Sequence, residues 1–184
     1  MTKLTLVGND PGIRDTGAVA IRLDNKEKTW AVHHDVWSGI TSRPDQKSQV
    51  INIDPVFQRQ WKQFVKDEED GAPTFVGVEG YRQRGTNPKQ DREMLFMVQS
   101  IQKMIPGSMV VDNTGIKNVV TRDMLKLFGV ARFSVNTNHS DLVSAARVAL
   151  KVGIQIPVLN EFIYQFILDN VEGEPWSLVS TSTR

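Results

Sequence analysis

Three carboxylates that lie far apart in the sequence each occur where a secondary-structure element is expected to begin or end. Asp10 follows an apolar run near the N-terminus, Glu79 follows the apolar run 74–78, and Asp141 opens a segment of helical composition. Carboxylate oxygens are the hard ligands that Mg²⁺ and Mn²⁺ prefer. We therefore expect folding to gather these three acids into a site for a divalent metal ion.

A carboxylate site of this kind is suited to phosphodiester hydrolysis. That reaction needs an activated water molecule and stabilisation of the leaving oxygen, and two metal ions about 3.5–4 Å apart can provide both. In this hypothesis Asp10 and Glu79 hold metal from neighbouring strands, and Asp141 does so from the start of a helix. Gly12, in the turn after Asp10, lets the backbone approach the site closely.

Each acid also has an ordinary structural explanation. Asp10 could belong to an Asx turn between two strands, Glu79 could be a solvated strand end, and Asp141 could be part of a helix N-cap with Ser140. A carboxylate directly after a buried run, however, needs a partner, because an unpaired buried charge is costly. Taken together, the three positions favour the metal site.

Basic residues and an aromatic residue follow Glu79 closely. They are Tyr81, Arg82, Arg84, Lys89 and Arg92. The arginines and the lysine could bind backbone phosphates beside the metal site, and the tyrosine could stack on an unpaired base. The alternative is a solvated charged loop, which is the usual explanation of a charge run.

The elements that must position these residues follow from hydrophobic periodicity and turn residues. The expected strands are 4–8, 18–23, 29–36, 74–79 and 108–111, with a possible extension at 132–135, and the expected helices are 50–66, 88–105, 117–128, 140–152 and 159–170. Three strands, a helix, and then alternating strands and helices predict an α/β fold with a mixed sheet flanked by helices. We expect one domain over 1–171 and a polar, flexible tail over 172–184.

The amino-acid composition excludes some kinds of chemistry and limits the choice of partners. The 184 residues include no cysteine, so disulfides, thiolate ligands and a cysteine nucleophile are excluded. The formal net charge of +1 gives no bulk argument for nucleic acid, so a DNA-binding surface requires local clustering. No signal-peptide pattern and no apolar run near the roughly 20 residues of a membrane span are present. The expectation is a soluble cytoplasmic protein without a membrane partner.

The ordered motifs resemble those of the RuvC-type Holliday-junction resolvases, which belong to the ribonuclease-H-like nucleases. The resemblance covers about residues 4–150 and is closest in character to phage-encoded members. Its motifs are Gly8-x-Asp10-Pro11-Gly12 with Thr16-Gly17, the strand-terminal Glu79, Lys117 in Ile116-Lys117-Asn118-Val119-Val120-Thr121, and Asp141 in an alanine-rich helix. It implies a ribonuclease-H-like fold and a crossover junction endonuclease of DNA recombination and repair.

The resemblance also implies the working parts of such an enzyme. It implies Mg²⁺, with Mn²⁺ able to substitute, held by Asp10, Glu79 and Asp141, and four-way or other branched DNA as the substrate. Lys117 matches a lysine that stabilises charge on the phosphate, and Tyr81 resembles an aromatic residue that contacts unstacked bases, one residue short of the usual spacing. The helix region 88–105 contributes to a homodimer in the family.

One position departs from the family pattern. A second metal-binding position, one helical turn after Asp141, falls on Ser144, and a serine is a poor replacement for a carboxylate. His139 is a second candidate ligand or proton-transfer group, with an exposed loop histidine as the alternative. The number of metal ions therefore stays open. So do two other functions: a ribonuclease-H-like nuclease acting on RNA–DNA hybrids or flaps, and a catalytically inactive junction-binding protein.

Overall fold

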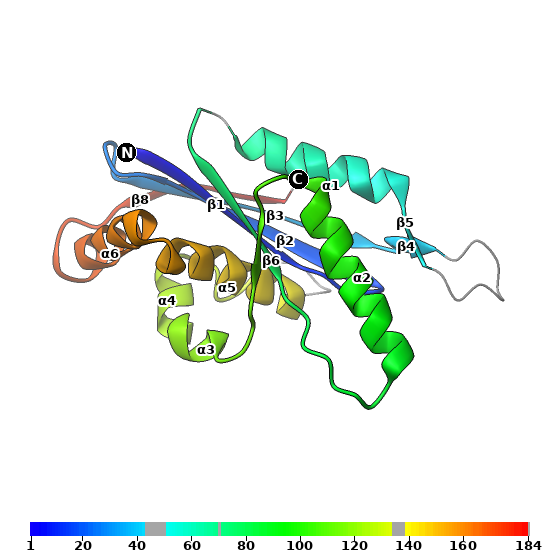
Figure 1. Cartoon of the computed structure of the whole chain (residues 1–184). Coiled ribbons are helices and arrows are strands. Elements are labelled where there is room, and N and C mark those ends of the chain that lie inside the picture. The colour runs from blue at the N-terminus through cyan, green and yellow to red at the C-terminus, as the bar shows by residue number, and fades with distance from the viewer. Residues whose placement is uncertain (43–50, 70, 134–138, 184) are drawn as a thin grey trace.

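A six-stranded mixed β-sheet forms the centre of the protein (Figure 1). The computed structural model describes residues 1–42, 51–69, 71–133 and 139–183. The sheet has the order β7-β6-β1-β2-β3-β8. Its strands are β1 (Lys3–Asp10), β2 (Asp15–Asp24), β3 (Thr29–Ser38), β6 (Thr74–Glu79), β7 (Met109–Val111) and β8 (Ser177–Thr183), while β4 (Thr41–Ser42) and β5 (Asn52–Ile53) form a separate pair.

The directions of the strands decide which residues meet. β2 runs antiparallel to both β1 and β3, whereas β6 is parallel to β1 and β7 is parallel to β6. Because β1 and β6 are parallel neighbours, their carboxyl ends lie at the same edge of the sheet. Asn9 pairs with Val78 in this ladder, which places Asp10 and Glu79 side by side.

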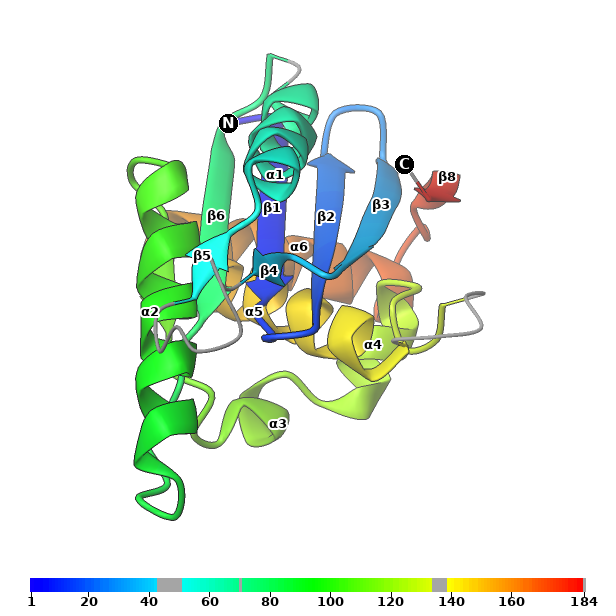
Figure 2. The ribbon, with the colours of Figure 1, turned by 90° about the vertical axis from the view of Figure 1, so that its right-hand side faces the viewer.

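Helices cover both faces of the sheet. They are α1 (Pro55–Glu68), α2 (Pro88–Met104), α3 (Ile116–Val119), α4 (Arg122–Leu127), α5 (His139–Gln155) and α6 (Pro157–Glu172). Figure 2 shows α1 in front of the sheet and α5 and α6 behind it. Side chains alternate along a strand, so Leu4 and Leu6 of β1 enter the core shared with α5, and Val7 enters the core shared with α1 and α2. The predicted α/β fold, a mixed sheet flanked by helices, is confirmed.

Several element boundaries differ from the prediction for local reasons. Helix α1 begins at Pro55 because the Asp54 side chain caps it and proline suits a first helical turn. The helix predicted over 117–128 is two short helices, and the Thr121 side chain caps the second. Helix α5 continues through Gly153, which was predicted to end it.

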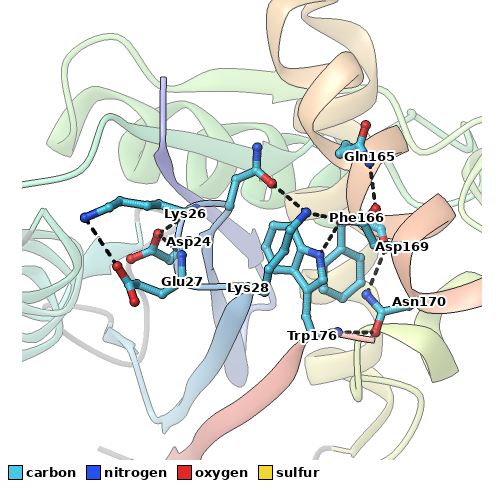
Figure 3. A network of polar contacts seen from close by, with 10 residues as sticks. Asp24, Lys26, Glu27, Lys28, Gln165, Phe166, Asp169, Asn170 and Trp176 are labelled. Atoms are coloured by element: carbon cyan, nitrogen blue, oxygen red, sulfur yellow. Dashed lines mark hydrogen bonds and ion pairs between the residues drawn. The ribbon is translucent and has the colours of Figure 1, made fainter. Parts of the chain in front are cut away.

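The C-terminal segment also differs from the expected tail. After α6 the chain forms β8, which pairs in parallel with β3. Figure 3 shows the contacts that hold its start: the indole of Trp176 donates to Asp169 at 2.9 Å, and the ammonium group of Lys28 pairs with the same carboxylate. These two donors, the lysine first, lower the pKa of Asp169 to about 2. Trp176 itself is buried against α6.

Two further expectations concern single segments. Residues 132 and 133 form no strand, and the rest of the proposed extension, 134–135, lies outside the described residues. Within the described ranges, no helix taken alone has the length and apolar character needed to cross a membrane. Helices α5 and α6 meet that test only as a pair, with a bend of 114° between them.

Candidate active site

The fold brings the three predicted acids to one edge of the sheet. Asp10 is the last residue of β1, and Glu79 is the last residue of the neighbouring parallel strand β6. Asp141 lies in the first turn of α5, the helix that packs across β1, β2 and β6. The acids therefore come from three separate elements, as the sequence predicted for a site assembled by folding.

Two glycines allow α5 to approach the sheet closely enough for this arrangement. A Cβ atom on Gly8 would lie 1.9 Å from the carbonyl oxygen of Ala145, and a Cβ atom on Gly17 would lie 2.9 Å from the carbonyl carbon of Asp141. Only glycine fits where two backbones are this close. Gly17 therefore sets the distance between β2 and the backbone of Asp141.

The turn after Asp10 is fixed by hydrogen bonds. The buried Thr16 hydroxyl accepts from the backbone N–H of Gly12 at 3.4 Å, and the Thr41 hydroxyl donates to the carbonyl of Ile13 at 2.9 Å. The turn is thus tied both to β2 and to the residues that follow β3. These contacts hold in place the turn that follows Asp10.

Burial and neighbouring negative charges both act on Asp10. Burial raises the pKa of Asp10 to about 9, together with the charge of Glu79, a hydrogen bond shared with Glu79 and the charge of Asp141; the Ser144 hydroxyl acts in the opposite direction. A carboxylate that is desolvated among other carboxylates is stabilised by a proton or by a cation. The oxygen donors here are of the type that Mg²⁺ and Mn²⁺ prefer.

The acids do not form a closed ligand set. Over the ranges that the structure describes, no group of three or more aspartate, glutamate or histidine side chains is arranged to hold a metal ion as it stands. Asp10 and Glu79 form the close pair, and Asp141 acts on it through its charge. Helix α5 begins at His139, but the side chain of this candidate ligand lies outside the description.

A cavity of about 410 Å³ adjoins the acid pair. It is lined by Glu79, Asn113, Gly115, Ile116, Lys117, Ser144 and Arg147. The amide of Asn113 donates to Glu79 Oε1 at 3.0 Å, which orients the carboxylate toward its neighbours. Lys117, which was singled out from the sequence, is exposed and shares this cavity with Glu79.

Of two further residues that line this cavity, sequence reasoning missed Asn113 and left Arg147 open between a phosphate contact and a salt bridge within the fold. Asn113 follows the short strand β7, and no local pattern singles it out. Arg147 lies one helical turn after Ser144 on α5, and that spacing was the available signal. Burial lowers the pKa of the Arg147 guanidinium, while the negative charge of Glu79 raises it, so the two groups are electrostatic neighbours.

A second cleft, of about 560 Å³, lies on the other side of Asp141. Its lining residues are Gly12, Ile13, Arg14, Asp15, Asn87, Lys89, Gln90, Glu93, Met94 and Asp141. Lys89 is therefore placed near the acids, as expected. Arg82, Arg84 and Arg92 are exposed on the loop before α2 and on its first turns. Each of the two cavities is thus lined by one of the acids and by basic residues.

Tyr81 is engaged with the protein in this structure. Its hydroxyl donates to Asp91 Oδ1 at 2.6 Å, and its ring packs against the core under α1 and α2. Asp91, which is buried, also accepts from the backbone N–H groups of Gly85 at 2.9 Å and Arg84 at 3.3 Å. Tyr81 therefore helps to anchor the basic loop, and stacking on a base requires it to leave these contacts.

Comparison with known proteins gives likeness to solved structures alone. No family model matches the chain. No curated protein matches it either. Among solved structures the chain is similar to T. thermophilus RuvC in complex with a Holliday junction substrate, with 16% sequence identity, a TM-score of 0.49, and coverage of 89% of this chain and 96% of that chain. Neither the identity nor the TM-score is high enough to assign a family or an activity.

The fold itself follows from the topology of this chain. Three antiparallel strands, a helix, and then alternating strands and helices form a mixed sheet covered on both faces. This is the element order that was predicted for a ribonuclease-H-like fold, and the acids occupy the carboxyl edge of its two central parallel strands.

Proposed function

We propose that this protein is a Mg²⁺- or Mn²⁺-dependent endonuclease of ribonuclease-H-like type that cuts branched DNA, four-way junctions above all. One observation carries the proposal. Asp10 and Glu79 lie side by side at the ends of parallel strands, and burial, together with the charges of Glu79 and of Asp141 on α5, raises the pKa of Asp10. The motif order that resembles junction resolvases supports the choice of substrate.

Asp10, Glu79 and Asp141 are the residues that would hold the cation. When bound, a divalent cation supplies activation of water and stabilisation of charge on the phosphate. Asn113 keeps Glu79 oriented through its 3.0 Å hydrogen bond. Lys117, on the wall of the adjoining cavity, is placed to stabilise negative charge on a phosphate bound there.

DNA binding is proposed for the basic residues on the loop before α2 and on the first turns of this helix. They are Arg82, Arg84, Lys89 and Arg92. All four are exposed, so they are free to reach backbone phosphates. Because the net charge of the chain is only +1, this local cluster has to supply the attraction to DNA.

A homodimer is the assembly that suits a four-way junction, because two equivalent sites can cut opposing strands symmetrically. The apolar stripe on α2 mostly packs into the core, but Phe96 on this helix is 43% exposed. It borders an open groove with Lys62 of α1 and Met104 of α2. We propose this part of α2 as the dimer contact, and analytical ultracentrifugation of wild type and Phe96→Ser tests it.

The experiment that tests the function uses a synthetic four-way junction and a linear duplex of the same sequence. Each is incubated with the protein in Mg²⁺, Mn²⁺ or EDTA, alongside Asp10→Asn. The matched control is Asp123→Asn, which changes an exposed aspartate on α4 that pairs with Lys126. The expected result is paired, metal-dependent cutting of the junction alone, lost in Asp10→Asn and kept in Asp123→Asn.

Other outcomes distinguish the alternatives. Tight junction binding without cuts in either metal would identify an inactive junction-binding protein, the function that Ser144 keeps open. Cuts in RNA–DNA hybrids or flaps but not in junctions would identify another ribonuclease-H-like nuclease. Neither binding nor cutting of any of these substrates would refute the proposal.

A further inference from the structure

Arg147 is a charged residue beside the candidate active site, and the sequence leaves open whether it contacts phosphate or forms a salt bridge within the fold. It lies on α5 one turn after Ser144, and both residues line the 410 Å³ cavity next to Glu79. The Nε atom of Arg147 is buried, and in the described part of the chain it has no hydrogen-bond partner. A buried donor left without an acceptor is destabilising, so its presence asks for an explanation.

Among the described residues, no acceptor for Arg147 Nε gives this side chain a structural role. Glu79 is close enough for its negative charge to act on the guanidinium, yet the hydrogen bond that this carboxylate receives comes from Asn113. The lining of the cavity includes a second cation, the exposed Lys117. An arginine and a lysine therefore line one cavity. Glu79, the acid in the same lining, already accepts a hydrogen bond from the uncharged side chain of Asn113.

An arginine and a lysine that face one cavity match the chemistry of a phosphate group. The planar guanidinium can donate two parallel hydrogen bonds to phosphate oxygens, and the ammonium group adds a point charge. We propose that this cavity is a phosphate subsite, in which Arg147 and Lys117 bind one phosphodiester group of the nucleic acid next to the acid pair; the nature of the ligand rests on the proposed function.

Such a subsite would also compensate for Ser144, which occupies the position of a metal-binding residue in the family pattern. A serine carries no charge, so the site has one fewer carboxylate than the family pattern and can neutralise less cationic charge. A fixed guanidinium beside Glu79 supplies positive charge at the phosphate without an additional carboxylate. Its contribution is largest when negative charge develops on the phosphate oxygens during the reaction.

The first test measures the NMR signal of the Arg147 guanidinium directly, so it requires neither a metal ion nor enzymatic activity. The Arg Nε–H signals of the ¹⁵N-labelled protein are recorded in EDTA during a titration with inorganic phosphate, and the Arg147 signal is identified by its loss in Arg147→Gln. The expected result is a saturable shift of the Arg147 signal, with no shift for Arg59, an exposed arginine on α1. No shift at Arg147, or equal shifts at both residues, would overturn the proposal.

The second test uses cleavage of the junction under single-turnover conditions at saturating Mg²⁺. We expect Arg147→Gln to lower the rate by about 10²–10³-fold, Arg147→Lys to recover part of it, and Arg59→Gln to match wild type. Arg147→Gln should also reduce the slope of log affinity against log salt by about one ion. A wild-type rate and a wild-type salt slope in Arg147→Gln would refute the subsite.

A purely structural role predicts a different pattern. In that case Arg147→Gln lowers the unfolding temperature and weakens Mn²⁺ binding, measured by calorimetric titration, without any phosphate-dependent shift in the wild-type protein. The two proposals also fail separately. If wild type cuts no branched DNA but Arg147 responds to phosphate, the proposed function fails and the subsite stands. If wild type cuts junctions but Arg147 does not respond, the subsite fails alone.

Discussion

Replacing Asp10 by asparagine should stabilise the metal-free protein, although the same change should abolish its activity. Burial and the negative charges of Glu79 and Asp141 raise the pKa of Asp10 from 3.8 to about 9, so at neutral pH the folded protein binds a proton that the unfolded chain does not. Stability therefore falls as the pH rises from about 4 toward 9. Asparagine does not titrate and can donate a hydrogen bond to Glu79, so the variant escapes this loss.

The size of the effect follows from the pKa interval. Each pKa unit corresponds to about 1.36 kcal/mol, so the interval from 3.8 to pH 7 sets an upper limit of about 4 kcal/mol on the gain in the free energy of unfolding. For a chain of this size that gain corresponds to a rise in Tm on the order of 10 °C. The advantage of Asp10→Asn should shrink as the pH approaches about 4 and grow at about pH 8.

The assay is thermal unfolding followed by circular dichroism in EDTA, at a series of pH values between about 5 and 8. Wild type, Asp10→Asn and the exposed control Asp123→Asn are compared. Addition of Mg²⁺ should then reduce the advantage of Asp10→Asn, because a ligand at 100 times its Kd stabilises the protein that binds it by about 2.7 kcal/mol. Only proteins that keep Asp10 should gain in this way.

One result would refute the electrostatic reasoning. If Asp10→Asn has the same Tm as wild type at about pH 8 in EDTA, and the same dependence on pH, Asp10 is not destabilised by its acidic neighbours. A lower Tm for the variant would show instead that the ionised carboxylate makes a favourable contact. Either result would remove the electrostatic support for a cation at this edge of the sheet.

Three further predictions concern the support of the site and of the fold. Gly17→Ala should lower stability by about 1–3 kcal/mol and weaken Mn²⁺ binding, because its methyl group would meet the Asp141 backbone at 2.9 Å; wild-type affinity by calorimetric titration would contradict this. Asp169→Asn should reduce stability above about pH 4, and its Tm should converge with that of wild type toward pH 2, because the folded-state pKa of Asp169 is lowered to about 2 and its stabilising ion pair is lost as the pH falls. Tyr81→Phe removes the hydroxyl that donates to Asp91 and should speed hydrogen exchange in the following basic loop with little change in global Tm; unchanged exchange would show that this contact does not hold the loop.

The sequence by itself determined the class of fold and the identity of the acids. Consecutive apolar residues before Asp10 and Glu79 predicted buried strands, and the placement of each acid at a strand end predicted a shared edge. These inferences are local: they need the burial pattern of a segment and the residue that ends it. The same local reasoning misplaced the start of α1, because Pro55 permits a helix only from its first turn onward.

Only the tertiary structure decided what surrounds the acids. Gly8 and Gly17 read as turn or strand glycines in the sequence, whereas their function is to let α5 approach the sheet, a close contact between segments more than 120 residues apart. Asn113 and Arg147 join Glu79 in one cavity because β6, β7 and α5 pack together. Pairing and packing of this kind depend on shape and volume between distant segments, and no pattern within a single segment records them.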